Sequence, residues 1–222
     1  MSRRTWTLGG LALALVGSAL WATSVGSVAI PFGTVTAALV DRLPGLGLMG
    51  VTSTQEAIVV HLRLPRVLLA AIVGGGLAVS GAALQGLFRN PMADPGIIGV
   101  SSGGALGGVF AVTSGLALER AWTLPLFAFV GATAATWIIY RLSTRHGRTP
   151  LAVLLLAGLA VSAFLSAMMS FLLSLAQNIL ILRELIFWLL GGLEGRGWHH
   201  LGLIVLPALL GCMALLFFAR DL

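Results

Sequence analysis

The chain contains no lysine, since all thirteen of its basic residues are arginine. The phosphate-binding loop of common ATPases ends in Gly-Lys followed by Ser or Thr, and its lysine reaches the nucleotide phosphates. A chain without lysine cannot form this loop. The absence excludes the usual class of ATP-hydrolysing subunits, and we expect the chain to bind no nucleotide or other cofactor itself.

Cysteine is almost absent too. The single Cys212 excludes an internal disulfide and a thiolate metal cluster. His199 and His200 are adjacent, and neighbouring residues of a helix do not share a face. Neither histidine has a carboxylate three or four positions away. The sequence therefore predicts no metal site.

Charged residues are scarce, at 9% of the chain, whereas 58% of the residues are hydrophobic. Mean hydropathy is +1.03, and soluble domains carry about a quarter charged residues. These values predict a protein of the bilayer. No ionisable residue lies near the middle of a predicted span, which argues against a proton relay or ion-coupled transport. No nucleophile, base and orienting residue are grouped as an intramembrane enzyme requires.

The apolar stretches are long enough to cross a membrane. A helix that spans a hydrocarbon core of about 30 Å needs about twenty apolar residues. Residues 177–196 are interrupted by Arg183 and Glu184, so we expect an interfacial or re-entrant segment there. The predicted fold is an all-α, polytopic membrane helical bundle in a single transmembrane domain, residues 1–222. The predicted spans are 8–30, 67–88, 95–118, 121–140, 151–174 and 198–219.

The loop after the fourth predicted span indicates the orientation. It carries Arg141, Arg145, His146 and Arg148 and no acidic residue. Short cytoplasmic loops are enriched in basic residues. We therefore expect this loop, and with it the amino terminus, on the cytoplasmic side.

A short polar segment joins the second and third spans. Asn90-Pro91 is typical of a turn, and Asp94 is suited to accept N–H groups at a helix start, with Pro95 at the first helical position. The segment predicts a rigid hinge. A contact between this hinge and a cytoplasmic partner is left open.

Two ladders of small residues follow the hinge. Gly99, Gly103 and Gly107 recur every four residues, which lets another helix approach closely. A second ladder is mildly polar and predicts either helix packing, with hydroxyls bonded to nearby backbone, or a face lining a water-filled pathway. This second ladder consists of Gly158, Ser162, Ser166, Ser170 and Ser174.

Arg63 and Arg66 flank Pro65 at the outer end of the second span. Arginines in this position often anchor a helix at the membrane surface. Two cations three residues apart could also receive carboxylates of a soluble partner through charge-assisted hydrogen bonds. The residues alone leave both interpretations open.

Several motifs together resemble the permease subunits of iron-siderophore, haem and vitamin B12 ABC importers, the FecCD type. The resemblance covers most of the chain, and its central motif, residues 80–95, is highly specific. The motifs are Arg63-Leu64-Pro65-Arg66, the segment from Ser80 to Pro95, Gly99-Val100-Ser101-Ser102-Gly103-Gly104-Ala105, and Trp188-Leu189-Leu190-Gly191-Gly192.

The resemblance implies a type II ABC importer transmembrane domain with ten helices per subunit, in the inner (plasma) membrane. It implies a second permease copy, most simply in a homodimer, two cytoplasmic ATPase subunits that bind ATP and Mg, and a periplasmic or lipid-anchored substrate-binding protein. Membrane lipid would surround the bundle, and no nucleic acid is involved. The expected substrate is a siderophore, haem or vitamin B12, carried by alternating access.

The resemblance also bears on individual residues. In the family, the positions of Arg63 and Arg66 receive acidic residues of the binding protein, which favours partner docking. The fifth helix resembles a pathway-lining helix, which favours that role for the Gly158 to Ser174 ladder. Because the chain stops at Leu222, we expect the amino-terminal two-thirds of a ten-helix permease. A truncated, non-transporting assembly partner is the alternative, and a secondary transporter is less favoured.

Overall fold

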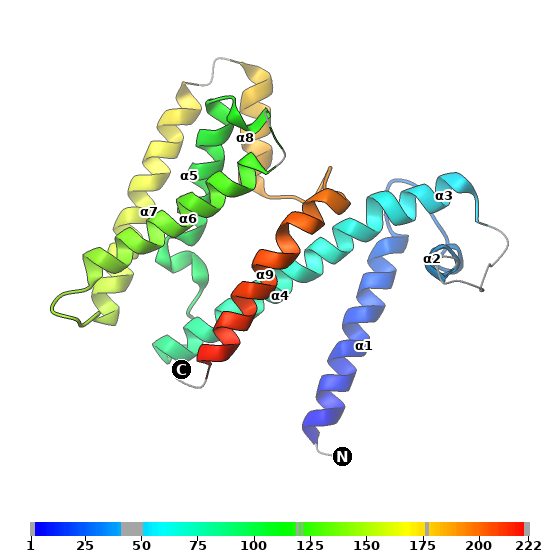
Figure 1. The fold of residues 1–222 in the computed structure, drawn as a ribbon, viewed down its shortest axis with the longest axis horizontal. Helices are drawn as coiled ribbons and strands as arrows, with labels where there is room; N and C mark the ends of the chain where they lie inside the picture. Colours follow the sequence, from blue (N-terminus) through cyan, green and yellow to red (C-terminus); the bar gives the residue numbers. More distant parts are fainter. Residues whose placement is uncertain (1–2, 41–50, 119, 121, 176–177, 220–222) are drawn as a thin grey trace. The chain divides into compact units, whose positions relative to one another are not determined.

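The computed structural model describes residues 3–40, 51–118, 120, 122–175 and 178–219. Within these residues the chain is helical and no strand is found, which confirms the predicted all-α class (Figure 1). The α-helices are α1 (Arg3–Ser24), α2 (Phe32–Val40), α3 (Ser53–Ala57), α4 (Leu64–Phe88), α5 (Val100–Thr113), α6 (Thr123–Ser143), α7 (Leu151–Ser174), α8 (Ile179–Leu190) and α9 (Trp198–Phe218). A π-helix covers Ile58–Arg63, and 3₁₀-helices cover Pro95–Ile98 and Leu116–Leu118.

Five described helices are long and apolar enough to cross a membrane. The third stretch differs from the continuous span expected over 95–118, because Gly99 has a φ of 76° and separates the 3₁₀-helix from the 14-residue α5. The expected boundaries at 121 and 177 lie outside the described residues. The five helices are Arg3–Ser24, Ser53–Phe88, Thr123–Ser143, Leu151–Ser174 and Trp198–Phe218.

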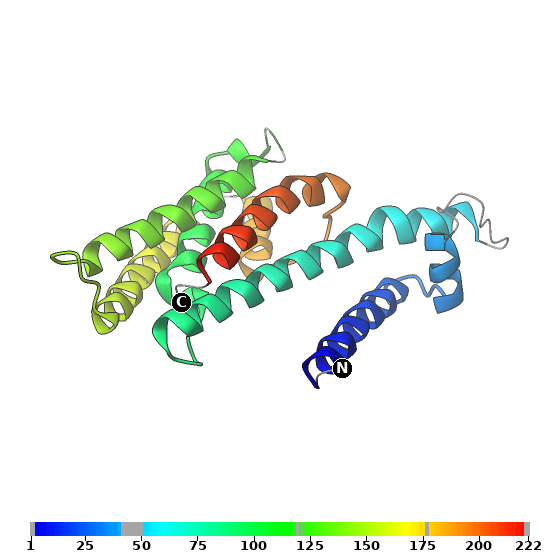
Figure 2. The ribbon, with the colours of Figure 1, turned by 60° about the horizontal axis from the view of Figure 1, so that its bottom comes forward.

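The chain divides into two compact units. One comprises Met1–Gly75 and Leu193–Ala208, and the other comprises Gly76–Gly192 and Leu209–Leu222. In the second unit α5 is the central helix, with α6, α7 and α8 packed around it (Figures 1 and 2). Val109 and Val112 of α5 are buried against Leu185 of α8. The segment 177–196, expected to be interfacial or re-entrant, thus supplies a short helix that packs on α5.

The first unit has a small core of its own, which Ile30, Val35, Ala38, Val59 and Val60 form. It brings α2 against the π-helix. The π-helix runs directly into α4, so residues 53–88 form one continuous helical stretch.

Pro65 explains the wide π turn at Ile58–Arg63. Proline has no N–H and its ring clashes with the carbonyl one turn before it, so an α-helix cannot continue undisturbed through it. In the structure the N–H of Leu64 bonds the carbonyl of Val59 in a π pattern. The next carbonyl, of Val60, would pair with the absent N–H of Pro65. The indole Nε1 of Trp198 donates to it instead, at 2.9 Å.

We expect Trp198→Phe to lower the free energy of unfolding by about 1–3 kcal/mol. Val60 is 1% exposed, so its carbonyl would lose its donor where water cannot replace it. Thermal unfolding of the purified protein in detergent measures the effect. Trp21→Phe is the control, because Trp21 is 66% exposed. Equal melting temperatures for the two variants would contradict the role given to the Trp198 indole.

Candidate functional site

Arg63 is buried, with 9% of its surface exposed, and its guanidinium faces the carboxyl-terminal end of α1. Nη1 donates to the carbonyl of Thr23 at 3.1 Å and to that of Ser24 at 2.9 Å. Nη2 donates to the carbonyl of Val28. The last carbonyls of a helix lack partners within it, and a cation interacts favourably with that end. Arg63 therefore holds the end of α1 against the π-helix.

Gly26 makes room for this guanidinium. A Cβ built at Gly26 would lie 2.7 Å from Nη2 of Arg63 and 2.9 Å from its Cζ. Any side chain at Gly26 would push the guanidinium away from the carbonyls of α1. A sequence pattern gives no sign of this contact, because the two residues are far apart in the chain.

Arg66 is placed differently from Arg63. It is half-buried, and its Nε is buried without a hydrogen-bond partner among the described residues. Both arginines line an open pocket of about 370 Å³, together with Gly26, Val28 and the exposed Glu194. The structure thus brings the two predicted docking residues together and distinguishes them: Arg63 bonds its own chain, whereas Arg66 keeps a donor unpaired. Glu194, which the sequence analysis did not single out, adds a carboxylate to the pocket.

The hinge after α4 is closed by a set of short-range hydrogen bonds. Arg89 has a φ of 46° and turns the chain out of the helix. Oδ1 of Asn90 accepts the N–H of Met92 at 3.0 Å. Nε2 of Gln85, in the last turn of α4, donates to the carbonyl of Pro91 at 3.1 Å. Turn residues and the end of α4 are therefore fastened to each other.

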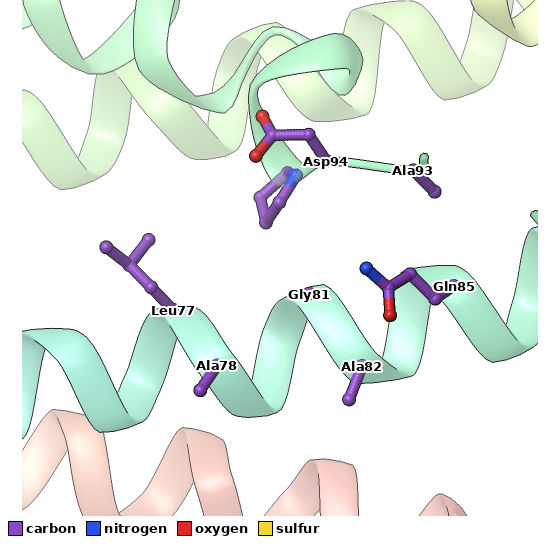
Figure 3. A pocket seen from close by; sticks show the side chains of 8 residues that line it. Leu77, Ala78, Gly81, Ala82, Gln85, Ala93 and Asp94 are labelled. Carbon is purple, nitrogen blue, oxygen red and sulfur yellow. The ribbon is translucent and has the colours of Figure 1, made fainter. Parts of the chain in front are cut away.

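Asp94 caps the 3₁₀-helix that follows the hinge. Its Oδ1 accepts the N–H of Gly96 at 2.7 Å, and Pro95 takes the first helical position. A pocket of about 340 Å³ lies between this turn and α4. Figure 3 shows Asp94 and Ala93 on one side and Leu77, Gly81 and Gln85 of α4 on the other. The carboxylate of Asp94 in the hinge and the amide of Gln85 in α4 therefore both line this pocket.

Gly103 and Gly107 lie against the backbone of α6. A Cβ at Gly103 would overlap the carbonyl oxygen of Gly131, and one at Gly107 would overlap that of Phe127. Gly131 meets the carbonyl of Gly103 in turn. Gly99 has little room as well, since a Cβ there would overlap Ile139. The ladder of α5 is the surface on which α6 packs most closely. Gly131 of α6 is the residue that meets this ladder. The sequence analysis did not predict its role, because an isolated glycine forms no repeating pattern.

The Gly158 to Ser174 ladder on α7 divides into a buried and an exposed part. Gly158 is buried against the carbonyl of Ile97, so α7 rests on the 3₁₀-helix of the hinge. Ser166, Ser170 and Ser174 are exposed. Their hydroxyls donate to the carbonyls of Ser162 at 2.8 Å, Ser166 at 3.0 Å and Phe171 at 2.7 Å, respectively. This part of α7 is a face of small residues whose hydroxyls already have acceptors, with no charge on it.

The hinge, α5 and α7 meet around Gly99. A Cβ at this position would lie 3.8 Å from the hydroxyl oxygen of Ser162. The predicted hinge, packing and ladder residues are therefore neighbours in the second unit, while Arg63 and Arg66 belong to the first. Within the described residues no group of three His, Cys, Asp or Glu side chains could hold a metal ion.

Comparison with protein families matches residues 12–222 to the FecCD transport family. The chain is 41% identical over 201 residues to the cobalamin import system permease protein BtuC of Halobacterium salinarum, which covers 90% of this chain and 52% of that protein. It is 40% identical over 161 residues to the vitamin B12 import system permease protein BtuC of Escherichia coli (strain K12 / DH10B), which covers 72% and 48%. The chain therefore spans about half the length of these curated relatives.

A similar fold exists among solved structures. The chain superimposes with a TM-score of 0.75 and 30% sequence identity on a transporter assigned to the metal-chelate ABC type, solved in an inward-facing conformation. The match covers 93% of this chain and 59% of the other.

Proposed function

The chain belongs to the FecCD transport family, and from this premise we propose that it forms part of the transmembrane permease of an ATP-binding-cassette importer. The family match over residues 12–222 is the observation that carries the proposal. Five apolar helices and the permease relatives make it a multi-pass inner-membrane protein. The proposed amino terminus is cytoplasmic, because the arginine-rich loop 141–148 then faces the cytoplasm.

The proposed substrate is a bulky metal chelate, either vitamin B12 or an iron chelate such as a siderophore or haem. Two relatives are named for cobalamin and vitamin B12 import, and the solved relative is described as a metal-chelate type. The uncharged face of α7 supports this choice. Its serine hydroxyls bond their own helix, so a large ligand could pass along small side chains without having to replace strong polar contacts.

The proposed source of energy is a separate ATPase. This chain has no lysine for a phosphate-binding loop, and ATP and Mg would bind to cytoplasmic ATPase subunits. A second permease copy, most simply an identical one, would complete the pathway. We assign docking of the external substrate-binding protein to the pocket of Arg63 and Arg66. Within it the guanidinium of Arg66 would receive a partner carboxylate, while Arg63 supports the surface from beneath.

Uptake of radiolabelled vitamin B12 and of ferric siderophores tests the proposed function. The protein that carries this chain is produced in a bacterium that lacks its own permease but keeps the ATPase and binding protein. We expect vanadate, which inhibits the ATPase, to abolish uptake. A proton ionophore should leave uptake unchanged. Uptake that follows the proton gradient would favour a secondary transporter. Absence of uptake in a correctly inserted protein would favour the assembly partner.

We expect Arg66→Glu to weaken association with the substrate-binding protein by about tenfold or more and to flatten its dependence on salt, since an attractive charge pair becomes a repulsive one. Binding at two salt concentrations by surface plasmon resonance measures both quantities. The control is Arg120→Glu, which reverses an exposed arginine outside this pocket. An unchanged affinity and salt dependence for Arg66→Glu would refute docking at this residue.

A further inference from the structure

The connection between α6 and α7 is a rigid hairpin that presents two arginines together. The N–H of Arg145 donates to the carbonyl of Arg148 and the N–H of Arg148 to the carbonyl of Arg145, each at 3.0 Å. His146 and Gly147 between them have φ values of 52° and 74°, as in the tightest two-residue turns. Residues directly opposite each other in such a pair project their side chains to the same face. Arg145 and Arg148 are exposed on it.

A third arginine lies just before this hairpin. Arg141, in the last turn of α6, is exposed, and its Cζ lies 5.6 Å from the ring centroid of Trp137. Residues 141–150 contain no aspartate or glutamate. Three cations within eight positions repel one another, so an anion bound among them would be strongly favoured.

An apolar groove of about 490 Å³ runs along α6 and includes Trp137, the ring that Arg141 contacts. Its lining is almost wholly apolar because the hydroxyls of Thr133 and Thr136 donate to the carbonyls of Phe129 and Ala132, at 2.8 and 2.9 Å. From Phe129 to Tyr140 the groove extends roughly 16 Å along the helix. This length is about half the thickness of a hydrocarbon core. The lining residues are Val100, Phe129, Ala132, Thr133, Thr136, Trp137 and Tyr140.

We propose that this face binds one anionic phospholipid, with its phosphate at Arg141, Arg145 and Arg148 and an acyl chain in the α6 groove. The groove lies on a helix long and apolar enough to span the membrane, and the arginines follow directly at the end of that helix. At this depth, phospholipid phosphates are the anions that the bilayer supplies. Orientation by positive charge requires cations in the loop, but it requires neither a hydrogen-bonded hairpin nor an apolar groove on the helix that precedes it.

Arg120 provides a matched control at the other end of α6. Its Cζ lies 5.9 Å from the ring centroid of Trp122, so it repeats the arginine–tryptophan contact of Arg141. No hairpin of paired arginines adjoins Arg120 among the described residues, and Arg120 does not line the α6 groove. A purely general attraction between arginine and membrane would make the two ends equivalent.

Native mass spectrometry of the detergent-purified protein, titrated with phosphatidylglycerol or with phosphatidylcholine of the same acyl chains, tests the proposal. We expect tighter binding of phosphatidylglycerol. The double change Arg145→Gln and Arg148→Gln should weaken it by about thirtyfold, since each basic residue contributes about a factor of five. Arg120→Gln should leave it unchanged. Equal affinity for the two lipids, or an equal loss in the Arg120 variant, would overturn the proposal.

A second pair of variants tests the groove without altering charge. Thr133→Phe places a ring in the groove, whereas Ala134→Phe adds the same ring at an exposed neighbour that does not line it. We expect Thr133→Phe alone to reduce phosphatidylglycerol binding. Glycerol phosphate that binds as tightly as the lipid would assign the arginines to a free anion instead. Loss of a dimeric species from Thr133→Phe with lipid binding unchanged would assign the groove to a second copy.

Discussion

Gly107→Ala should destabilise the second unit, with a loss of about 2–4 kcal/mol in the free energy of unfolding. The new methyl would overlap the carbonyl oxygen of Phe127 and lie 2.8 Å from its carbonyl carbon. Both atoms belong to the backbone of α6, so no side-chain rotation relieves the overlap. The two helices must move apart, and the contacts along their whole crossing weaken. Thermal unfolding in detergent, followed by circular dichroism, measures the change.

Gly104→Ala is the control for this prediction, because it makes the same substitution one turn away in the same helix. Its methyl would lie 3.5 Å from the carbonyl oxygen of Ala128, an ordinary contact distance. Alanine is also the better helix former by about 1 kcal/mol, so this variant should match or slightly exceed the parent in stability. If both variants melted at the parent temperature, the close approach of α5 and α6 would not exist.

Arg63→Gln should be the second most damaging substitution, with a loss of about 2–4 kcal/mol. The carbonyls of Thr23, Ser24 and Val28 would lose their donors, the first at a buried and the other two at part-buried positions. An unpaired buried group costs about 1–3 kcal/mol, and water offsets part of this cost at the part-buried positions. The shorter glutamine cannot reach all three. Amide hydrogen exchange at the end of α1 and the melting temperature together measure the loss of this brace.

Arg66→Gln is the matched change three residues away. Arg66 is half-buried and has an unpaired Nε, so its loss should alter stability by less than about 0.5 kcal/mol. It should nevertheless weaken association with the binding protein. We therefore expect Arg63→Gln to lower mainly the stability and Arg66→Gln to lower mainly the affinity for the binding protein. A stable Arg63→Gln protein that failed only in partner binding would instead make Arg63 a docking residue.

Much of the architecture could be predicted because membrane helices depend on local composition. Apolar length alone predicted an all-α membrane bundle, and a specific motif predicted the family. Capping chemistry at Asp94 and Pro95 is local as well, since the carboxylate bonds an N–H two residues along. Spacing of four residues marked Gly103 and Gly107, although it could not tell which helix approaches them.

The remaining features depend on contacts between distant parts of the chain. The partners of the Arg63 guanidinium lie 35 to 40 residues earlier, so the motif around Pro65 gives no sign of them. The carbonyl of Val60, which Pro65 leaves without a backbone donor, is bonded by Trp198, 138 residues further along the chain. The sequence also did not predict the helix break at Gly99. The apolar run through this residue is typical of a continuous helix, and the break becomes visible only in the positive φ of Gly99. Local patterns therefore marked the candidate residues, whereas long-range packing determined the contacts that each of them makes.

The central claim is that α7 carries an uncharged face along which a substrate crosses the membrane, and cysteine accessibility tests it most directly. With Cys212 replaced by serine, no cysteine remains in this chain, and single cysteines can be placed at Ser166, Ser170 and Ser174. Phe164 and Phe171, which are also exposed, lie about a third of a turn around α7 from Ser170 and provide cysteines on a different face. We predict that a charged, membrane-impermeant thiol reagent labels cysteines at the three serine positions in intact membranes. Vitamin B12 or a ferric chelate should slow this labelling. Cysteines at the two phenylalanine positions should stay unlabelled. Labelling of neither set, or of both equally, would contradict a pathway along this face.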